Sequence, residues 1–258
     1  MKKWIFIGFG VLVIIIVLLL ILGISNLGPI IKEAVNTHGP GITKTELSLG
    51  DVGISIFSGE AKLKKFHMGN PKGFKAPSAM DVGSIYVDVD EGSLTKDTIV
   101  IDRVEVVDPE ITYEKAGIID NFKAILRNVK RSVGAGGPSK KKQPEKKEGG
   151  EKKFLIRDFI MKSGRVNLAL PLPGGKSITA ELPDLHLKDV GKETGGASAA
   201  QVFEQVLAAI YEKITSSEVS DVLNKELKAL GLDLDKIGKD VPKGLKPLSE
   251  KVKGLFGN

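Results

Sequence analysis

The pattern of apolar and polar positions begins with an uninterrupted apolar run, Trp4 to Ile24, of 21 residues without a charge. A helix of about 20 apolar residues is long enough to cross the hydrocarbon core of a bilayer. The run exceeds the apolar core of roughly 7 to 15 residues found in cleaved signal peptides, and Gly23-Ile24-Ser25 is a poor cleavage site. We therefore predict an uncleaved transmembrane anchor over residues 4–25, after a short cytoplasmic tip at residues 1–3.

The charges that flank this run predict the orientation of the chain. Lys2 and Lys3 precede the run, whereas no charge follows it before Lys32. Positively charged flanks stay in the cytoplasm, so we expect the remainder of the chain to be exported. In a Gram-negative bacterium this describes a single-pass inner-membrane protein with a cytoplasmic N-terminus and a periplasmic body.

After the anchor, short runs of alternating apolar and polar residues predict β-strands. Turn-forming residues separate the runs, for example Gly50-Asp51 and the segment from Gly69 to Gly73. The predicted strands cover residues 42–49, 52–59, 60–68, 83–90, 98–107, 110–115, 154–164, 165–172 and 177–187. We expect an α+β fold in which these strands form one twisted, mostly antiparallel sheet.

Other segments have apolar residues at helical spacing. A short amphipathic stretch at residues 30–37 should stop at the turn His38 to Gly41. A helix is predicted over residues 118–133, with an apolar side that should pack on the sheet. That side consists of Ile118, Phe122, Ile125, Leu126 and Val129.

A helical C-terminal region is predicted at residues 199–257, with helices over 199–215 and 219–230. Its last amphipathic stretch, residues 245–256, either lies at the membrane interface or docks on the body of the protein. The β-rich part accordingly divides into residues 29–133 and 153–191, with a linker at 134–152 between them.

The segment from Arg127 to Lys153, which contains the linker, holds the excess positive charge of the chain. The net charge is +6, and between Arg127 and Lys153 ten Lys or Arg face three Glu. Without large apolar residues the linker cannot form a core, and without interleaved aromatics it does not indicate nucleic-acid binding. A solvated linker is the simplest interpretation, and attraction to anionic lipid headgroups is the alternative. The candidate residues for headgroup contact are Lys140, Lys141, Lys142, Lys146 and Lys147.

Two internal matches indicate a loose repeat in the strand regions. Residues 99–111 align with residues 154–166, and residues 61–68 align with residues 180–187. The offsets differ between the two matches. We therefore interpret the sheet as built from a repeated unit into which the linker is inserted.

The sequence contains no recognisable catalytic, cofactor or metal motif. There is no cysteine, and the three histidines (His38, His67 and His186) lack metal-ligand spacing. The pairs Asp88/Asp90 and Asp233/Asp235 resemble the start of a calcium loop but lack its later residues. Ser58 lacks the context of an activated nucleophile. We therefore expect a protein that is not an enzyme and binds no cofactor.

One combination of motifs resembles a known family. A G-x-x-x-T-x-x-x-L-x-L pattern starts at Gly39, a GNPKGF element follows at Gly69 to Phe74, and an I-x-x-V-x-V-x-x-P-x-I-x-Y run spans Ile101 to Tyr113, with Asn121 shortly after. Together with the anchor, this order resembles short members of the AsmA-like family of bacterial envelope proteins over about residues 1–190. The C-terminal KGLFGN also resembles those members.

The resemblance implies a groove-shaped or taco-shaped sheet related to modules of bridge-like lipid transporters, and a role in envelope or outer-membrane lipid homeostasis. The expected partner is membrane phospholipid, and the alternative is a scaffold that binds an envelope protein or a second copy of itself. Residues expected in the core or in contact with lipid are Ile54, Ile56, Leu63, Phe66, Ile85, Val87, Ile99, Ile101, Val104, Phe154, Ile156, Phe159, Val166 and Leu168.

Overall fold

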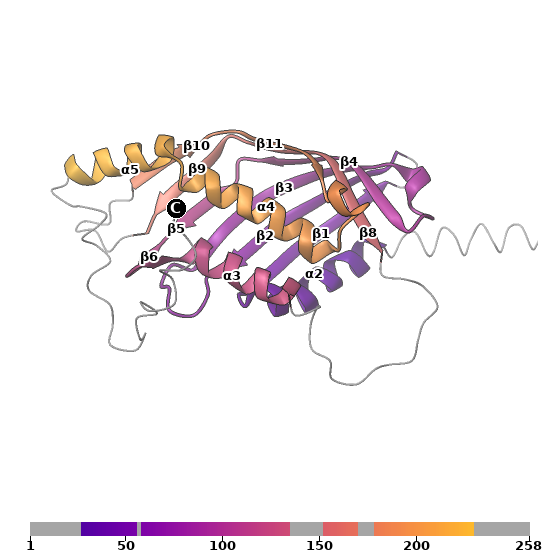
Figure 1. Cartoon of the computed structure of the whole chain (residues 1–258), viewed down its shortest axis with the longest axis horizontal. Coiled ribbons are helices and arrows are strands. Elements are labelled where there is room, and N and C mark those ends of the chain that lie inside the picture. The colour runs from indigo at the N-terminus through magenta and orange to yellow at the C-terminus, as the bar shows by residue number, and fades with distance from the viewer. Residues whose placement is uncertain (1–26, 56–57, 135–151, 170–177, 230–258) are drawn as a thin grey trace, which may run out of the picture.

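The computed structural model describes residues 27–55, 58–134, 152–169 and 178–229 (Figure 1). The predicted anchor at residues 4–25, Ile56, the lysines from Lys140 to Lys147 and the stretch at 245–256 lie outside these ranges. Within them, no helix is both long and apolar enough to cross a bilayer. The described chain has an α+β fold with a mixed sheet and four α-helices.

Nine strands form the large sheet. They are β1 (Leu47–Ser55), β2 (Glu60–Gly69), β3 (Ser78–Val89), β4 (Thr98–Val107), β5 (Glu110–Tyr113), β8 (Lys153–Lys162), β9 (Gly164–Leu168), β10 (Ile178–Leu182) and β11 (Leu185–Val190). β1, β2 and β3 are antiparallel neighbours, and β3 pairs with both β4 and β5. The pairs β4–β8 and β5–β9 are parallel, while β8–β11 and β9–β10 are antiparallel. The expected α+β class and antiparallel majority are therefore confirmed.

The strand pairs β4/β5, β8/β9 and β10/β11 each form one long strand with a break. The sheet can therefore be followed as six long strands in the order β1, β2, β3, β4/β5, β8/β9, β10/β11. The paired positions on both sides of the breaks place one residue of each strand in a single transverse row. We call it the offset row, and it consists of Gly50, Lys65, Gly83, Asp108, Ser163 and Pro183.

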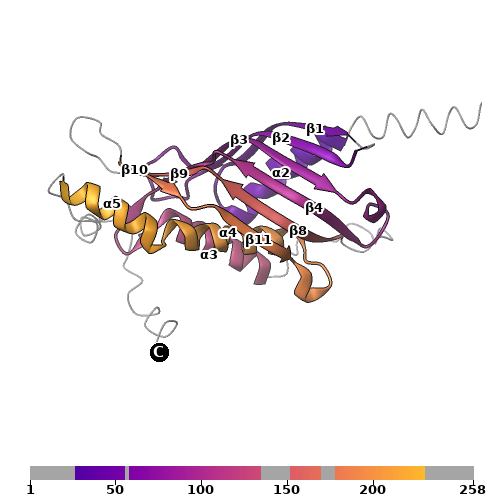
Figure 2. The same cartoon turned by 90° about the horizontal axis from the view of Figure 1, so that it is seen from above.

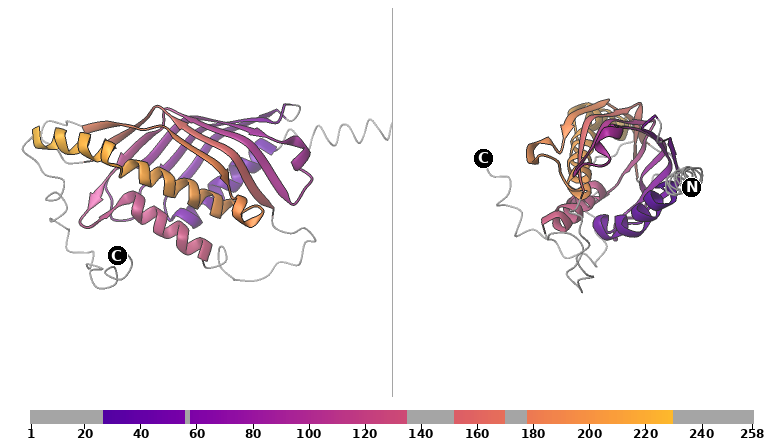
Figure 3. Two further views of the ribbon diagram at one scale, coloured as in Figure 1. Left: turned by 45° about the horizontal axis from the view of Figure 1, so that its top comes forward. Right: turned by 90° about the vertical axis from the view of Figure 1, so that its right-hand side faces the viewer.

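Every long strand contains one extra residue at the offset row. Side chains that face the core are mostly two residues apart but are three apart here, as in Leu49 and Val52 or Phe66 and Leu63. A second spacing of three lies in β4, between Ile101 and Val104, and in the strands that follow it. Lys65, Asp108 and Ser163 have positive φ angles of 54°, 51° and 54°. Extra residues of this kind bend a strand, so their alignment across all strands bends the whole sheet. Figure 3 shows the resulting curved cross-section.

The helices lie on the concave side of the curved sheet (Figures 2 and 3). They are α2 (Leu27–Thr43), α3 (Asn121–Gly134), α4 (Ala199–Ile214) and α5 (Ser217–Ala229). α2 runs antiparallel along β1, with its start beside Val52 and its end beside Leu47. The two elements approach so closely that a Cβ at Gly28 would lie 2.3 Å from the Val52 carbonyl oxygen, and one at Gly39 would lie 2.3 Å from Cδ2 of Leu47. Asn36 also exchanges hydrogen bonds with the backbone of Leu49 and so covers the edge of β1.

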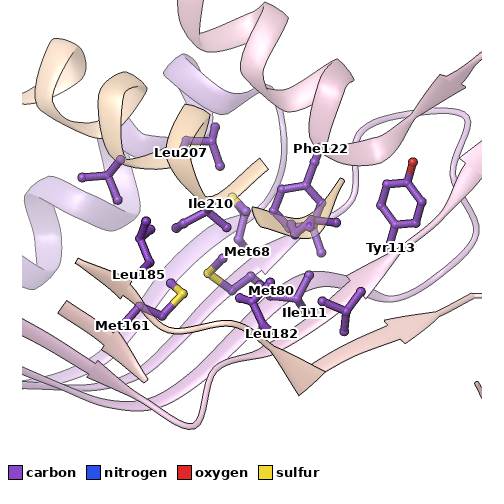
Figure 4. Close-up of a cluster of buried hydrophobic side chains, with 14 of the residues drawn as sticks. Met68, Met80, Ile111, Tyr113, Phe122, Met161, Leu182, Leu185, Leu207 and Ile210 are labelled. Atoms are coloured by element: carbon purple, nitrogen blue, oxygen red, sulfur yellow. The ribbon is translucent and has the colours of Figure 1, made fainter. Parts of the chain in front are cut away.

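The core lies between the concave face and α3, α4 and α5. Phe122 of α3 and Leu207 and Ile210 of α4 meet Met68, Met80 and Met161 of the sheet (Figure 4). Phe122, Met68 and Leu207 are at most 1% exposed. Burial of such side chains contributes about 1.5 to 3 kcal/mol each, so this layer holds the helices on the sheet.

Three predictions about elements are wrong. The expected turn at Gly50-Asp51 lies inside β1, because Gly50 belongs to the offset row. The helix predicted over residues 30–37 extends from Leu27 to Thr43 and continues through Pro40. Packing of Gly39 on Leu47, and the hydrogen bond from the Thr43 hydroxyl to the Gly39 carbonyl, stabilise the helix on both sides of this proline.

The third error concerns the start of the helix predicted over residues 118–133. Ile118 is 76% exposed, between β6 (Lys115–Ala116) and β7 (Ile119–Asp120), which form a small hairpin. Gly117 supplies the left-handed conformation that this turn requires (φ 67°). The Asp120 carboxylate accepts a hydrogen bond from the Lys123 amide at 2.7 Å, so the helix starts after Asp120.

Candidate functional site

The concave face carries two continuous apolar rows on the side of the offset row where the β3–β4 turn lies. Each row takes one residue from each of the six strands. The first row is Val52, Leu63, Ile85, Val106, Met161 and Leu185. The second row is Ile54, Ala61, Val87, Val104, Phe159 and Leu187.

The structure divides the predicted core or lipid-contact residues into two groups. Ile156, Phe159, Val166 and Leu168 are at most 6% exposed and belong to the core. They are therefore covered by the described protein. The second group is half-buried and consists of Ile54, Leu63, Phe66, Ile85, Val87, Ile99, Ile101, Val104 and Phe154. Ile56 lies outside the described residues.

The half-buried residues differ in how they pack. Phe66, Ile85, Ile101, Val104 and Phe154 contact the core cluster. Ile54, Leu63, Val87 and Ile99 are not part of that cluster and keep partial exposure. We call Ile54, Leu63, Ile85, Val87, Ile99, Ile101 and Val104 the half-buried apolar surface. Its residues are more exposed than Ile156, Phe159, Val166 and Leu168 of the same face.

The opposite, convex face is polar and carries cross-strand ion pairs. Arg157 bonds Asp102, Lys162 lies 2.9 Å from Glu105, and Arg165 lies 2.6 Å from Glu110. The residues of the first and third pairs are 55 positions apart, the offset of the first internal match, and those of the second pair are 57 apart. That match therefore corresponds to the parallel pairing of β4/β5 with β8/β9.

Two histidines contact carboxylates on the convex face. His67 Nδ1 lies 2.6 Å from Asp81, and His186 Nε2 lies 2.6 Å from Asp158. The hydrogen bond from His186 lowers the pKa of Asp158, and the hydrogen bond from Lys162 lowers the pKa of Glu105. The Ser58 hydroxyl bonds Ser55 and Glu60. Within the described ranges, no three His, Asp or Glu residues gather as metal ligands do.

A depression of about 610 Å³ lies over β1 to β4. Its lining includes Glu60, Lys62, Asp88 and Arg103, and Lys62 stands 4.8 Å from the centre of the Tyr86 ring. These polar side chains alternate with Ala61, Val87 and Val104 along their strands and so belong to the convex face. Of the predicted lipid-contact residues, only Ile54 and Val87 border this depression.

Several motif residues of the family resemblance form a buried polar cluster. The Asn121 side chain, which is fully buried, accepts from the amides of Glu114 and Phe122 and donates to Asn70 and to the carbonyl of Thr112. The Glu114 carboxylate accepts from the amides of Lys75 and Ala76. The cluster therefore fixes the GNPKGF loop to the start of α3, which is a structural role.

A second buried polar group lies beside it. The Tyr211 hydroxyl of α4 donates to Oδ2 of Asp120 at 2.9 Å. Burial raises the pKa of Tyr113 and of Tyr211, and the negative charge of Asp120 raises both further. Asp120 thus connects the N-terminus of α3 to α4, and Tyr113 adds its ring to the core.

Comparison with known proteins provides no further assignment: no family model and no curated protein sequence matches this chain.

Sequence reasoning missed Val89 of the concave face, the arrangement of cations on α3 and six residues of the two apolar rows, namely Val52, Ala61, Val106, Met161, Leu185 and Leu187. Ala61 lies in the second apolar row, and Val89 pairs with Ile101. The signal that could have located the rows is the spacing of three between apolar residues, which recurs in every long strand.

Proposed function

We propose that the protein is a non-enzymatic, inner-membrane-anchored periplasmic protein of the AsmA-like type that acts in envelope lipid homeostasis. In this proposal the curved sheet is a short groove, and its half-buried apolar surface contacts the acyl chains of phospholipid. The observation that carries it is the pair of apolar rows, of which Ile54, Leu63 and Val87 remain partly exposed. Partly exposed apolar rows on a concave face suit an elongated apolar ligand.

The position of the surface also supports the proposal. α2 begins three residues after the apolar run ends at Ile24. Its first turn lies beside Val52 of β1, close to Ile54 and the β1–β2 connection. The partly exposed rows therefore lie near the end of the molecule from which the predicted anchor extends, where lipid from the same membrane is closest.

Photo-crosslinking at neighbouring residues of one strand tests this function. A benzophenone amino acid is placed at Leu63 or Val87 on the concave face, and matched controls at Lys64 or Tyr86 place it on the convex face. The full chain is irradiated in a bacterial envelope and its adducts are identified by mass spectrometry. We expect phospholipid adducts from residues 63 and 87 and few from 64 and 86. Equal lipid labelling from both faces, or none from either, would contradict the proposal.

A second candidate function is a scaffold for an envelope protein. It is favoured by the extent to which α3, α4 and α5 already fill the concave side, and by the exposure of Ile30 (58%) and Ile118 (76%) on the outside. The same experiment, with the benzophenone amino acid also placed at Ile30 or Ile118, separates the two functions. Protein adducts at Ile30 or Ile118, without lipid adducts at residues 63 and 87, would place the scaffold first.

A further inference from the structure

The outer side of α3 carries a stripe of positive charge. The helix contains Lys123, Arg127, Lys130 and Arg131 and no acidic residue. At about 100° per residue these four cations lie on one side, opposite the buried Phe122, Ile125 and Val129. Lys130 and Arg131 are exposed, and Lys123 and Arg127 are half-buried. We call these four residues the cationic stripe.

Among the described residues, the cationic stripe has no carboxylate partner of the kind that several cations of the sheet have. Arg157, Lys162 and Arg165 on the sheet each contact a carboxylate. No residue of the stripe forms an ion pair with another described residue. Like charges four residues apart on a helix repel, and this applies to Lys123 with Arg127 and to Arg127 with Arg131. The arrangement therefore favours binding of an external anion.

The stripe lies close to the helix that follows the predicted anchor. Asn128 of α3 donates to the carbonyl of Thr43, and Ser132 donates to that of Ile42, at the end of α2. α2 has 17 residues, a length of about 25 Å, and α2 and α3 lie on the same side of the molecule (Figures 1 and 3). The first two turns of α2 also expose Leu27 (38%), Ile30 (58%) and Ile31 (38%).

We propose that the cationic stripe of α3 binds the anionic headgroups of the bilayer in which the chain is anchored, so that the helical side of the protein lies against the membrane surface. This inference rests on the membrane anchorage within the proposed function and does not depend on lipid in the sheet. A lysine or arginine near an anionic surface strengthens association about five-fold. These four cations, together with the exposed apolar side chains at the opposite end of α2, give the helical side of the protein two places of contact with a bilayer interface.

A fluorescent probe on α3 tests the proposal. The chain has no cysteine, and a Cβ at the exposed Gly134 would meet nothing within 4 Å, so Gly134→Cys accepts a single label. The labelled full chain is reconstituted in nanodiscs that carry a headgroup-linked nitroxide quencher. We expect about three-fold stronger quenching with roughly 30% phosphatidylglycerol than with phosphatidylcholine alone. The difference should shrink as added salt screens the charges.

Two variants, each with four positive charges removed, test whether the cationic stripe causes the stronger quenching. K123Q/R127Q/K130Q/R131Q should lower quenching to the phosphatidylcholine level. K64Q/K72Q/K188Q/K225Q removes four exposed lysines from other surfaces and should leave quenching unchanged. The lysines from Lys140 to Lys147 remain in both variants, so their contribution is constant. Circular dichroism confirms that both variants keep their helix content.

The outcomes separate this inference from the proposed function. A chain that fails to co-elute with nanodiscs overturns the anchorage and the inference together. A chain that co-elutes but shows equal quenching in both lipids, or unchanged quenching in the stripe variant, overturns the inference alone. Crosslinking from residue 134 to an acidic protein in the envelope, without lipid dependence in nanodiscs, also overturns it in favour of a protein partner.

Discussion

The Asn121 side chain donates a 2.8 Å hydrogen bond to Oδ1 of Asn70, which lies 51 residues earlier in the chain. Asn70 in turn donates to the carbonyls of Ala76 and Ser78. A loop before β3 and the first residue of α3 are thereby held in one buried network. Because buried polar groups cost free energy when unpaired, this network allows few substitutions.

Asn121→Ala should lower the free energy of unfolding by about 2 to 3 kcal/mol, because it leaves several buried groups without partners. Urea unfolding in a mild detergent, followed by circular dichroism, measures this change. Asn224→Ala in α5, a half-buried asparagine, is the matched control and should change stability by less than about 0.5 kcal/mol. A similar loss in both variants would contradict the role given to Asn121.

Substitutions at Ser163 test the left-handed backbone conformation in the offset row. A residue other than glycine in the left-handed region costs roughly 1 to 2 kcal/mol, and Ser163 has φ 54°. Ser163→Gly should therefore stabilise the protein by about 0 to 1 kcal/mol after the entropy cost of glycine. Ser163→Val should destabilise it by about 2 kcal/mol or more. Thermal unfolding of both variants measures the difference, and equal melting temperatures would disprove the assigned strain.

Two residues of the second apolar row, Val87 and Phe159, should tolerate charge differently. Phe159 is 5% exposed, whereas Val87 is half-buried and outside the core cluster. Phe159→Asp buries an unpaired charge and should cost about 4 kcal/mol or more. Val87→Asp should cost about 1 to 2 kcal/mol and keep the fold. If Val87→Asp unfolds the protein as readily as Phe159→Asp, the half-buried apolar surface is a closed core.

The raised pKa values of Tyr113 and Tyr211 predict a loss of stability in alkaline solution. Their pKa values are raised in the folded protein, first by burial and then by Asp120. Above a pH of about 10 the unfolded chain releases these phenolic protons while the folded chain retains them. Stability should therefore be complete below that pH and fall above it. The double variant Y113F/Y211F should show a shallower decline between about pH 10 and 12, and an unchanged slope would contradict this assignment.

The existence of the strands was largely predictable from the sequence, because alternation of apolar and polar residues is a local signal. The strand predicted over residues 98–107 matches β4, and the helix predicted from residue 199 matches α4. α4 starts with a capping box between Ser198 and Gln201, an arrangement with a recognisable sequence pattern.

The errors arose where tertiary packing overrides local signals. Pro40 and its flanking glycines indicate a helix stop, yet contact with Leu47 keeps them helical. Gly50-Asp51 has turn composition but lies in β1 because every neighbouring strand carries an extra residue at the same level. Which of the predicted lipid-contact residues are covered depends on where α3 and α4 pack. No local pattern at Ile156 or Val87 contains that information.

The offset row also limits how this protein can change over evolutionary time. Deletion of one residue from one strand would turn all following side chains of that strand to the other face, because side chains alternate with period two. Insertions and deletions in a strand are therefore tolerated only where neighbouring strands change with it or where a bulge absorbs the extra residue, as β4 does opposite Asp88 and Val89. Substitutions within each face remain permitted. Distant relatives of this chain would thus share the spacing of three at the offset row long after the residues themselves had ceased to match.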